Sequence, residues 1–194
     1  MSSLRGLVLS LAVLAAMAGA ACGDPPDKEM QQAQGAIDAA RAAGADQYAT
    51  AEFTAAEDAL KRSRDAVDQR DYRQALNNAL DARERAQAAA KESVNSKAIA
   101  RADATKAIAE SDAALHDSRA KLKAAETARV AVRTVSNGRK AIDAGESAVQ
   151  EARTAFEKED YLKSIEVAHG ILAQLGPATR DLEAAAAGGG RRRH

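Results

Sequence analysis

Apolar residues recur at an interval of seven through long stretches of this alanine-rich chain, and this spacing limits its fold more than any other feature. Two such series are Ile108, Leu115, Leu122 and Val135, Ile142, Val149, Phe156. An interval of seven is two turns of α-helix, so the members of each series line one side of a helix, as in a coiled coil. Alanine makes up about a quarter of the chain; it is the best helix former but buries little apolar area. The sequence therefore predicts an all-α fold of elongated antiparallel helical hairpins, a coiled-coil-like bundle with a thin core.

The charges of the chain balance. Its 194 residues include 28 Lys+Arg and 28 Asp+Glu, and it contains no Trp. A balanced charge creates no long-range field that would attract nucleic acid or an acidic substrate. We therefore expect no nucleic-acid partner.

The first half of the chain contains the signals of three helices. The first is expected from about Asp27 to Ala43 with Gly44 as its C-terminal cap, and the second from about Ala49 to Gln69. Asp71 is placed to cap a third helix that begins at Tyr72. A tight antiparallel reversal between the second and third helices follows from this arrangement.

The same reversal is predicted a second time. Residues 56–82 align without gaps to residues 145–171, so two hairpins each turn at an Asp-Tyr pair. The aspartates are expected to cap the helices that follow, and the tyrosine rings to seal the base of each hairpin. The alternative is that the rings contact a ligand. The residues that carry these structural roles are Asp71, Tyr72, Asp160 and Tyr161.

The second hairpin contains glycines at positions that a helix would place on its inner face. Gly138 and Gly145 each cost roughly 1 kcal/mol relative to alanine inside a helix, so their presence needs a reason. One reason is the close approach of a neighbouring helix. The other is that Ser136-Asn137-Gly138 interrupts the helix. The sequence leaves these two interpretations open.

The last inward stripe is expected to end at Gly176-Pro177, because proline cannot continue a helix without losing a hydrogen bond. Its members would be Tyr161, Ile165, Ala168, Leu172 and Leu175. A short helix over about 178–186 would follow. The sequence predicts a flexible basic tail over residues 188–194.

The N-terminal 21 residues have the pattern of a secretory signal. Arg5 supplies a positive charge, an apolar run follows, and small residues come before Cys22, the sole cysteine. The run is too short to span a bilayer, which needs about 20 apolar residues. Cleavage after Ala18 or Ala20 would leave a free exported thiol, whereas lipoprotein processing would make Cys22 the acylated N-terminus.

The stretch Gly19-Ala20-Ala21-Cys22 resembles a bacterial lipobox. This resemblance implies that Cys22 is the lipid attachment residue and that residues 1–21 are a lipoprotein signal peptide. Gly23 rather than aspartate follows the cysteine, which by resemblance to the sorting rule of Gram-negative lipoproteins implies the outer membrane. Pro25 and Pro26 would then form a short extended tether.

From Cys22 to about Val94 the chain resembles alanine-rich bacterial lipoproteins that carry a helical domain of unknown function. The motifs in common are the lipobox, "RAAGADQYA" at residues 41–49 and "DYRQAL" at residues 71–76. The resemblance implies a helical envelope protein, and it brings neither an activity nor catalytic residues.

No residue pattern predicts catalysis. Asp112 and His116 lie one helical turn apart, but two ligands on an exposed helix make a weak metal site. No Cys/His cluster, phosphate-binding loop or nucleophile elbow is present in the sequence. We expect no catalytic residue, no metal, no cofactor and no enzymatic activity.

The sequence thus predicts a signal peptide (1–21), a first helical hairpin module (22–95), a long connecting helix with a second hairpin (96–187) and a basic tail (188–194). We expect a lipid-anchored, periplasm-facing protein of the bacterial envelope with a structural, spacer or assembly role. It would be held at the membrane by N-terminal acyl chains, with self-association or an envelope protein as a further partner. The alternative is a helical-repeat-like adaptor that binds a peptide or an envelope protein.

Overall fold

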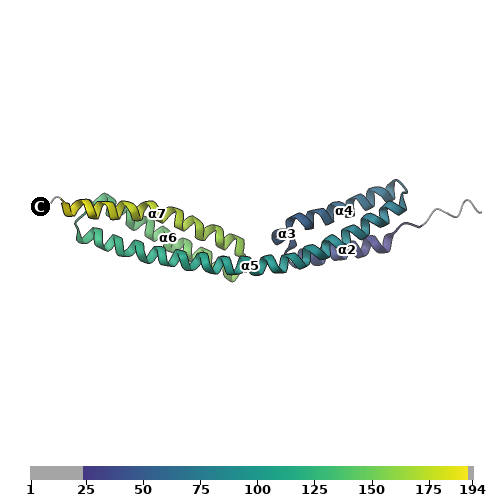
Figure 1. The fold of residues 1–194 in the computed structure, drawn as a ribbon, viewed down its shortest axis with the longest axis horizontal. Helices are drawn as coiled ribbons and strands as arrows, with labels where there is room; N and C mark the ends of the chain where they lie inside the picture. Colours follow the sequence, from purple (N-terminus) through teal and green to yellow (C-terminus); the bar gives the residue numbers. More distant parts are fainter. Residues whose placement is uncertain (1–23, 192–194) are drawn as a thin grey trace, which may run out of the picture. The chain divides into compact units, whose positions relative to one another are not determined.

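The computed structural model describes residues 24–191, and this part of the chain is all-α with no strand (Figure 1). The predicted fold class is confirmed. The helices are α2 (Asp27–Ala42), α3 (Ala45–Tyr48), α4 (Thr50–Asp68), α5 (Tyr72–Thr127), α6 (Val132–Glu157) and α7 (Tyr161–Arg191). The described residues divide into two compact units, of which the first ends at Val94 and the second begins at Asn95.

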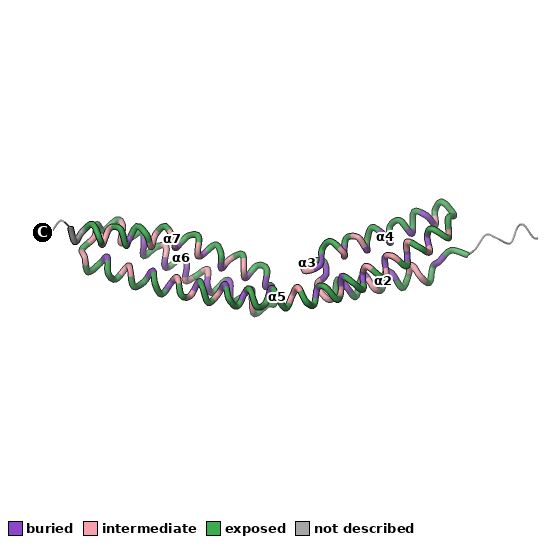
Figure 2. The backbone as a smooth tube through the Cα atoms, viewed as in Figure 1, coloured by how far each residue is buried: buried purple, intermediate pink, exposed green. Residues whose placement is uncertain are grey.

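Unit 1 is built from α2, α3, α4 and the first part of α5. Its buried cluster consists almost entirely of alanines from these helices, with Ile37, Phe53 and Leu60 as the large side chains. Buried positions recur along one side of each of these helices (Figure 2), and none of their charged residues is buried. Because alanine has no side chain beyond Cβ, helices with such faces can pack closely.

Unit 2 contains the rest of α5 together with α6 and α7. Its larger cluster has Leu115 from α5, Ile142 and Val149 from α6, and Ile171 and Leu175 from α7. Three of these residues come from the two series of sevens. The periodicity therefore identified the inner faces of α5 and α6.

The helix α6 runs without a break through both of its inner glycines. A Cβ atom built on Gly138 would lie 2.7 Å from Leu182 Cδ1, and one on Gly145 would lie 3.0 Å from Leu115 Cδ2. Contacts this short are not tolerated without a shift of the neighbour. Close approach is therefore the reason for these glycines, and the alternative of an interrupted helix is wrong.

The helix α7 does not end at Gly176-Pro177, as the sequence had suggested, but continues to Arg191. Proline removes one backbone hydrogen bond, yet the packing beyond it holds the helix. Leu182 is 1% exposed and fills the notch at Gly138, and Thr179 hydrogen-bonds Ser118 over 2.8 Å. Part of the expected tail is thus helical, and residues 192–194 lie outside the described part. The buried stripe also contains Ser164 and Ile171, whereas Ile165 and Leu172 are half-buried.

Candidate functional site

The two predicted Asp-Tyr turns have the same backbone structure. Arg70 and Glu159 both adopt the left-handed conformation, with φ of 58° and 61°. The N–H of Asp71 donates to the carbonyl of Ala66, and the N–H of Asp160 donates to that of Ala155, both over 2.9 Å. These are the bonds of a Schellman helix end. The gapless alignment of the two segments therefore corresponds to a repeated local structure.

Both aspartates accept a hydrogen bond at the start of the next helix. The N–H of Gln74 donates to Asp71 Oδ1 over 2.9 Å, and the N–H of Lys163 donates to Asp160 Oδ1 over 3.2 Å. Each bond satisfies an amide that has no partner within its own helix. Asp71 and Asp160 are thus the N-caps of α5 and α7.

The two tyrosines differ in burial. Tyr161 is 6% exposed, and its ring packs edge-on against Phe156 with centroids 5.2 Å apart. Tyr72 is only half-buried, and the position that matches Phe156 is occupied by Val67. The structure therefore gives Tyr161 the sealing position, whereas Tyr72 keeps part of its ring at the surface.

A buried serine joins the two helices of each hairpin. Ser63 Oγ donates to the carbonyl of Ala75 over 2.7 Å, and Ser164 Oγ donates to the carbonyl of Ala152 over 2.8 Å. In the alignment Ser63 matches Ala152, and Ala75 matches Ser164. Both hairpins thus have a serine-to-carbonyl hydrogen bond at the same position. The serine lies on the first helix, α4, in one hairpin and on the second helix, α7, in the other.

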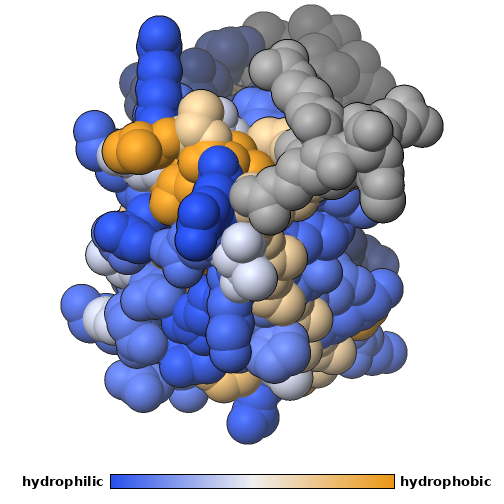
Figure 3. Space-filling view, turned by 90° about the vertical axis from the view of Figure 1, so that its left-hand side faces the viewer, coloured by the Kyte–Doolittle hydropathy of each residue, from blue (hydrophilic) through white to orange (hydrophobic). Residues whose placement is uncertain are grey.

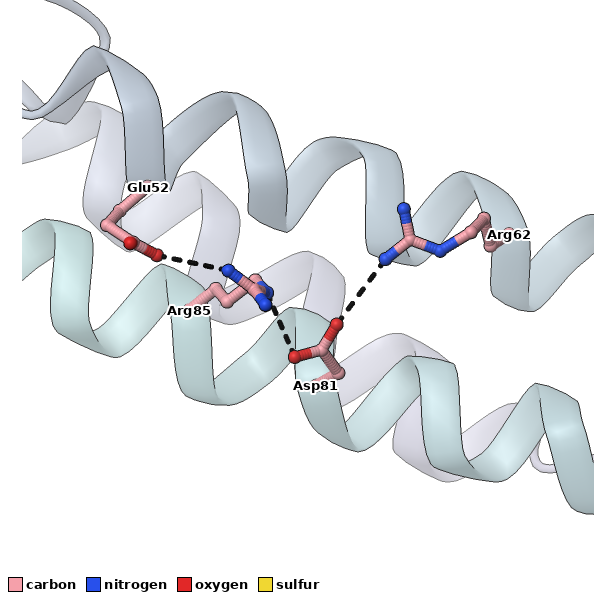
Figure 4. A network of polar contacts seen from close by, with 4 residues as sticks. All are labelled: Glu52, Arg62, Asp81 and Arg85. Atoms are coloured by element: carbon pink, nitrogen blue, oxygen red, sulfur yellow. Dashed lines mark hydrogen bonds and ion pairs between the residues drawn. The ribbon is translucent and has the colours of Figure 1, made fainter.

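Ion pairs connect α4 to α5 on the surface of unit 1 (Figure 4). Arg85 contacts Glu52 over 3.4 Å and Asp81 over 2.9 Å, and Asp81 also contacts Arg62 over 3.4 Å. All four side chains are between 37% and 53% exposed. Exposed pairs contribute about 0–1 kcal/mol each, so this network adds little to stability.

Two ionisable groups of unit 2 have shifted pKa values. The pKa of Glu159 is lowered, chiefly by a hydrogen bond from Lys97 Nζ to Glu159 Oε2 over 2.6 Å. The pKa of Lys121 is raised, first by its hydrogen bond to Glu183 and then by that to Asp117. Both groups are partners of surface ion pairs, and this is the ordinary direction of shift for such pairs.

An open groove lies between α6 and α7 in unit 2, with a volume of about 540 Å³. Its polar side chains are Thr134, Asn137, Gln174 and Asp181, and its other walls are small residues and Pro177.

Figure 3 looks at the end of unit 2 and shows a small group of hydrophobic atoms on a mainly hydrophilic face. Val132, at the start of α6, is 84% exposed.

In the weak metal pair suggested by the sequence, Asp112 forms an ion pair with Arg153. Both carboxylate oxygens of Asp112 accept hydrogen bonds from Arg153 Nη2, over 2.9 and 2.7 Å, and His116 is exposed. No group of three or more His, Cys, Asp or Glu side chains that could hold a metal ion occurs in the described part of the chain.

Cys22 lies outside the described residues, which begin at Asp24. The chain is folded soon afterwards. Pro26 is buried, the N–H of Asp27 donates to the carbonyl of Pro25 over 2.9 Å, and that of Met30 donates to the carbonyl of Pro26 over 3.0 Å. In the described range, none of the helices has the length and apolar character that crossing a membrane requires.

A further reversal of the chain is not predicted by its sequence. It joins α5 to α6 with Arg129 at φ 55° and the N–H of Val130 donating to the carbonyl of Ala125. Glycine, proline and asparagine, the usual turn residues, are missing from residues 126–133. The local signal is weak: it consists of the β-branched residues Thr127, Val130 and Val132, whose helix propensity is lower than that of alanine.

No protein-family model, curated protein or solved structure matches this chain.

Proposed function

We propose that this chain is a lipid-anchored helical protein of the bacterial cell envelope, acylated at Cys22 and facing the periplasm from the outer membrane. Its role is structural, as a spacer or assembly factor, and not catalytic. The proposal rests first on the sequence Gly19-Ala20-Ala21-Cys22, in which small residues precede the sole cysteine at the end of an apolar run.

The structure adds where such an anchor would be attached, because the fold begins soon after this cysteine. Pro26 is already buried in unit 1, and α2 begins at Asp27. An acyl group on Cys22 would thus be attached almost directly to a packed bundle. Several acyl chains on one residue hold a protein firmly, whereas a single chain binds reversibly.

Metabolic labelling tests this proposal. The full chain is produced in a Gram-negative host with a clickable palmitate analogue, beside Cys22→Ser and Ser96→Ala as a matched control outside the signal. We expect wild type and S96A to be labelled and to fractionate with membranes. C22S should lose the label almost completely and either remain unprocessed or become soluble. Equal labelling of C22S and wild type would refute acylation at this residue.

The groove between α6 and α7 favours a second candidate function, that of an adaptor. Its polar side chains and small floor residues form a surface on which an extended peptide can lie. Asn137→Arg with Gln174→Arg would fill this groove, and Gln87→Arg in unit 1 is the control. Loss of a cross-linked envelope neighbour in the groove variant alone would support the adaptor. Unchanged cross-linking in every variant would exclude the groove as its binding surface.

A further inference from the structure

We infer that one end of unit 1, formed by the start of α2 and the α4–α5 turn, rests on the phospholipid headgroups with Tyr72 at the interface. This inference depends on the proposed acylation of Cys22. It adds the orientation of the first bundle and the residues that meet the membrane.

The covalent chain sets a short distance between the anchor and the fold. Cys22 precedes Asp24, the first described residue, by two positions. Two residues span at most about 7 Å even when fully extended. An acylated Cys22 must enter the bilayer at the headgroup level, so Asp24 stays close to that level whatever conformation the link adopts.

The fold allows little movement at this point. Pro26 is buried, and hydrogen bonds from Asp27 and Met30 fix the carbonyls of Pro25 and Pro26. The anchor is therefore attached to the body of unit 1 by a few residues. A long linker would let the bundle move far from the membrane, whereas this short connection keeps the start of α2 near the anchor.

The contacts between α2 and α4 identify which end of unit 1 is involved. Arg41 contacts Glu57 over 2.6 Å, and Arg64 donates to Gln34 over 2.8 Å. In both pairs, each step forward along α2 corresponds to one step back along α4, so the two helices are antiparallel in one register. If this register continues to the start of α2, Asp27 lies level with the α4–α5 turn. Figure 1 shows this turn beside the start of α2, with α3 at the opposite end of α4.

The side chains at this end suit a headgroup layer. Lys28, Arg70 and Arg73 are exposed cations, and Asp24, Asp27, Asp68 and Asp71 are exposed anions. This mixture matches phospholipids that carry phosphate together with an ammonium group, so the acyl chains provide affinity and the protein surface sets orientation. The half-exposed Tyr72 is of the type that is enriched at membrane interfaces. Its counterpart Tyr161 is buried against Phe156 instead.

Tryptophan fluorescence provides the test, because the chain contains no Trp. Tyr72→Trp and Tyr48→Trp are matched variants at opposite ends of α4, which spans 19 residues or about 28 Å. Each acylated full-length protein is purified from membranes and reconstituted in phosphatidylcholine–phosphatidylethanolamine vesicles. The vesicles contain lipids brominated near the top of the acyl chains. We expect the emission of Y72W to be quenched at least threefold more than that of Y48W.

The outcomes separate the two proposals. Flotation of both variants with the vesicles, together with equal quenching or stronger quenching of Y48W, would overturn the orientation and leave acylation intact. Failure of both variants to float, with no acyl group in their mass spectra, would overturn the proposed function and the orientation with it. Stronger quenching of Y72W in the floating protein supports the inference.

Discussion

At the scale of single residues, the two aspartate caps are small contacts with a measurable effect. Asp71→Ala or Asp160→Ala removes an acceptor from an amide at the start of a helix. We expect each substitution to lower the free energy of unfolding by about 0.5–2 kcal/mol, with the shorter bond of Asp71 giving the larger loss. Urea denaturation measures both effects.

Asp68→Ala is the control for these variants. Asp68 is exposed and ends α4, where a negative charge is unfavourable beside the helix C-terminus. Its replacement should leave stability unchanged or raise it slightly. An equal loss in D68A and D71A would mean that the effect comes from charge and not from capping.

The two tyrosines should differ far more than the two aspartates. Tyr161→Ala removes a ring that is 6% exposed and packed on Phe156, which should cost about 3–5 kcal/mol. Tyr72→Ala removes a half-exposed ring and should cost at most about 1.5 kcal/mol. Thermal denaturation followed by circular dichroism distinguishes them. If Y72A proves the more damaging of the two, the burial described here is not what stabilises the turns.

At the scale of the helices, the inner glycines of α6 hold a neighbour at short range. Gly138→Ala places a methyl group 2.7 Å from Leu182, whereas Gly35→Ala on α2 meets nothing within 4 Å. Alanine is favoured over glycine in a helix by about 1 kcal/mol, and overpacking costs about 1–3 kcal/mol. We expect G35A to stabilise the protein. G138A should be less stable than G35A by about 1–3 kcal/mol, the cost of overpacking. Chemical denaturation of the two variants gives this difference, and equal gains would show that Leu182 moves freely aside.

The ion pair between α5 and the α6–α7 turn should make stability depend on pH. The pKa of Glu159 is lowered by Lys97, so the folded state favours its carboxylate. The contribution is therefore fully present above the usual glutamate pKa of about 4.3 and disappears as the pH falls through the lower value in the folded state. We expect the stability difference between wild type and Glu159→Gln to shrink as the pH is lowered from 6 towards 3, and to shrink in high salt. A difference that is constant over this range would show that the pair contributes nothing.

The sequence was sufficient for the helices whose inner faces follow an interval of seven and for the two turns that begin with aspartate. The sequence did not predict the α5–α6 turn, because its left-handed residue is Arg129 and arginine does not favour that conformation. The continuation of α7 through Pro177 also could not be read locally, since it depends on Leu182 reaching the notch at Gly138. In α7, a contact with a neighbouring helix thus outweighs the local preference of proline.

At the scale of the whole chain, each unit has a hydrophobic cluster of its own. Phe53 and its buried neighbours lie in unit 1, and Leu115 with its neighbours lies in unit 2. We expect Phe53→Ala to cost about 3–5 kcal/mol of local stability and Leu115→Ala about 2–5 kcal/mol. Hydrogen exchange should show F53A weakening amide protection up to Val94, and L115A weakening it from Asn95 onwards. Parallel losses across both units in either variant would show that they unfold as one.

The exchanged serines of the two hairpins bear on the ancestry of the chain. If residues 56–82 and 145–171 descend from one duplicated segment, the interhelical bond changed sides in one copy without being lost. Serine and alanine are separated by a single nucleotide, and an intermediate with serine at both positions would still have had a hydroxyl facing a carbonyl. Two single substitutions therefore suffice for the exchange. Two duplicated segments can thus keep the same hydrogen bond although the residue that donates it differs between them.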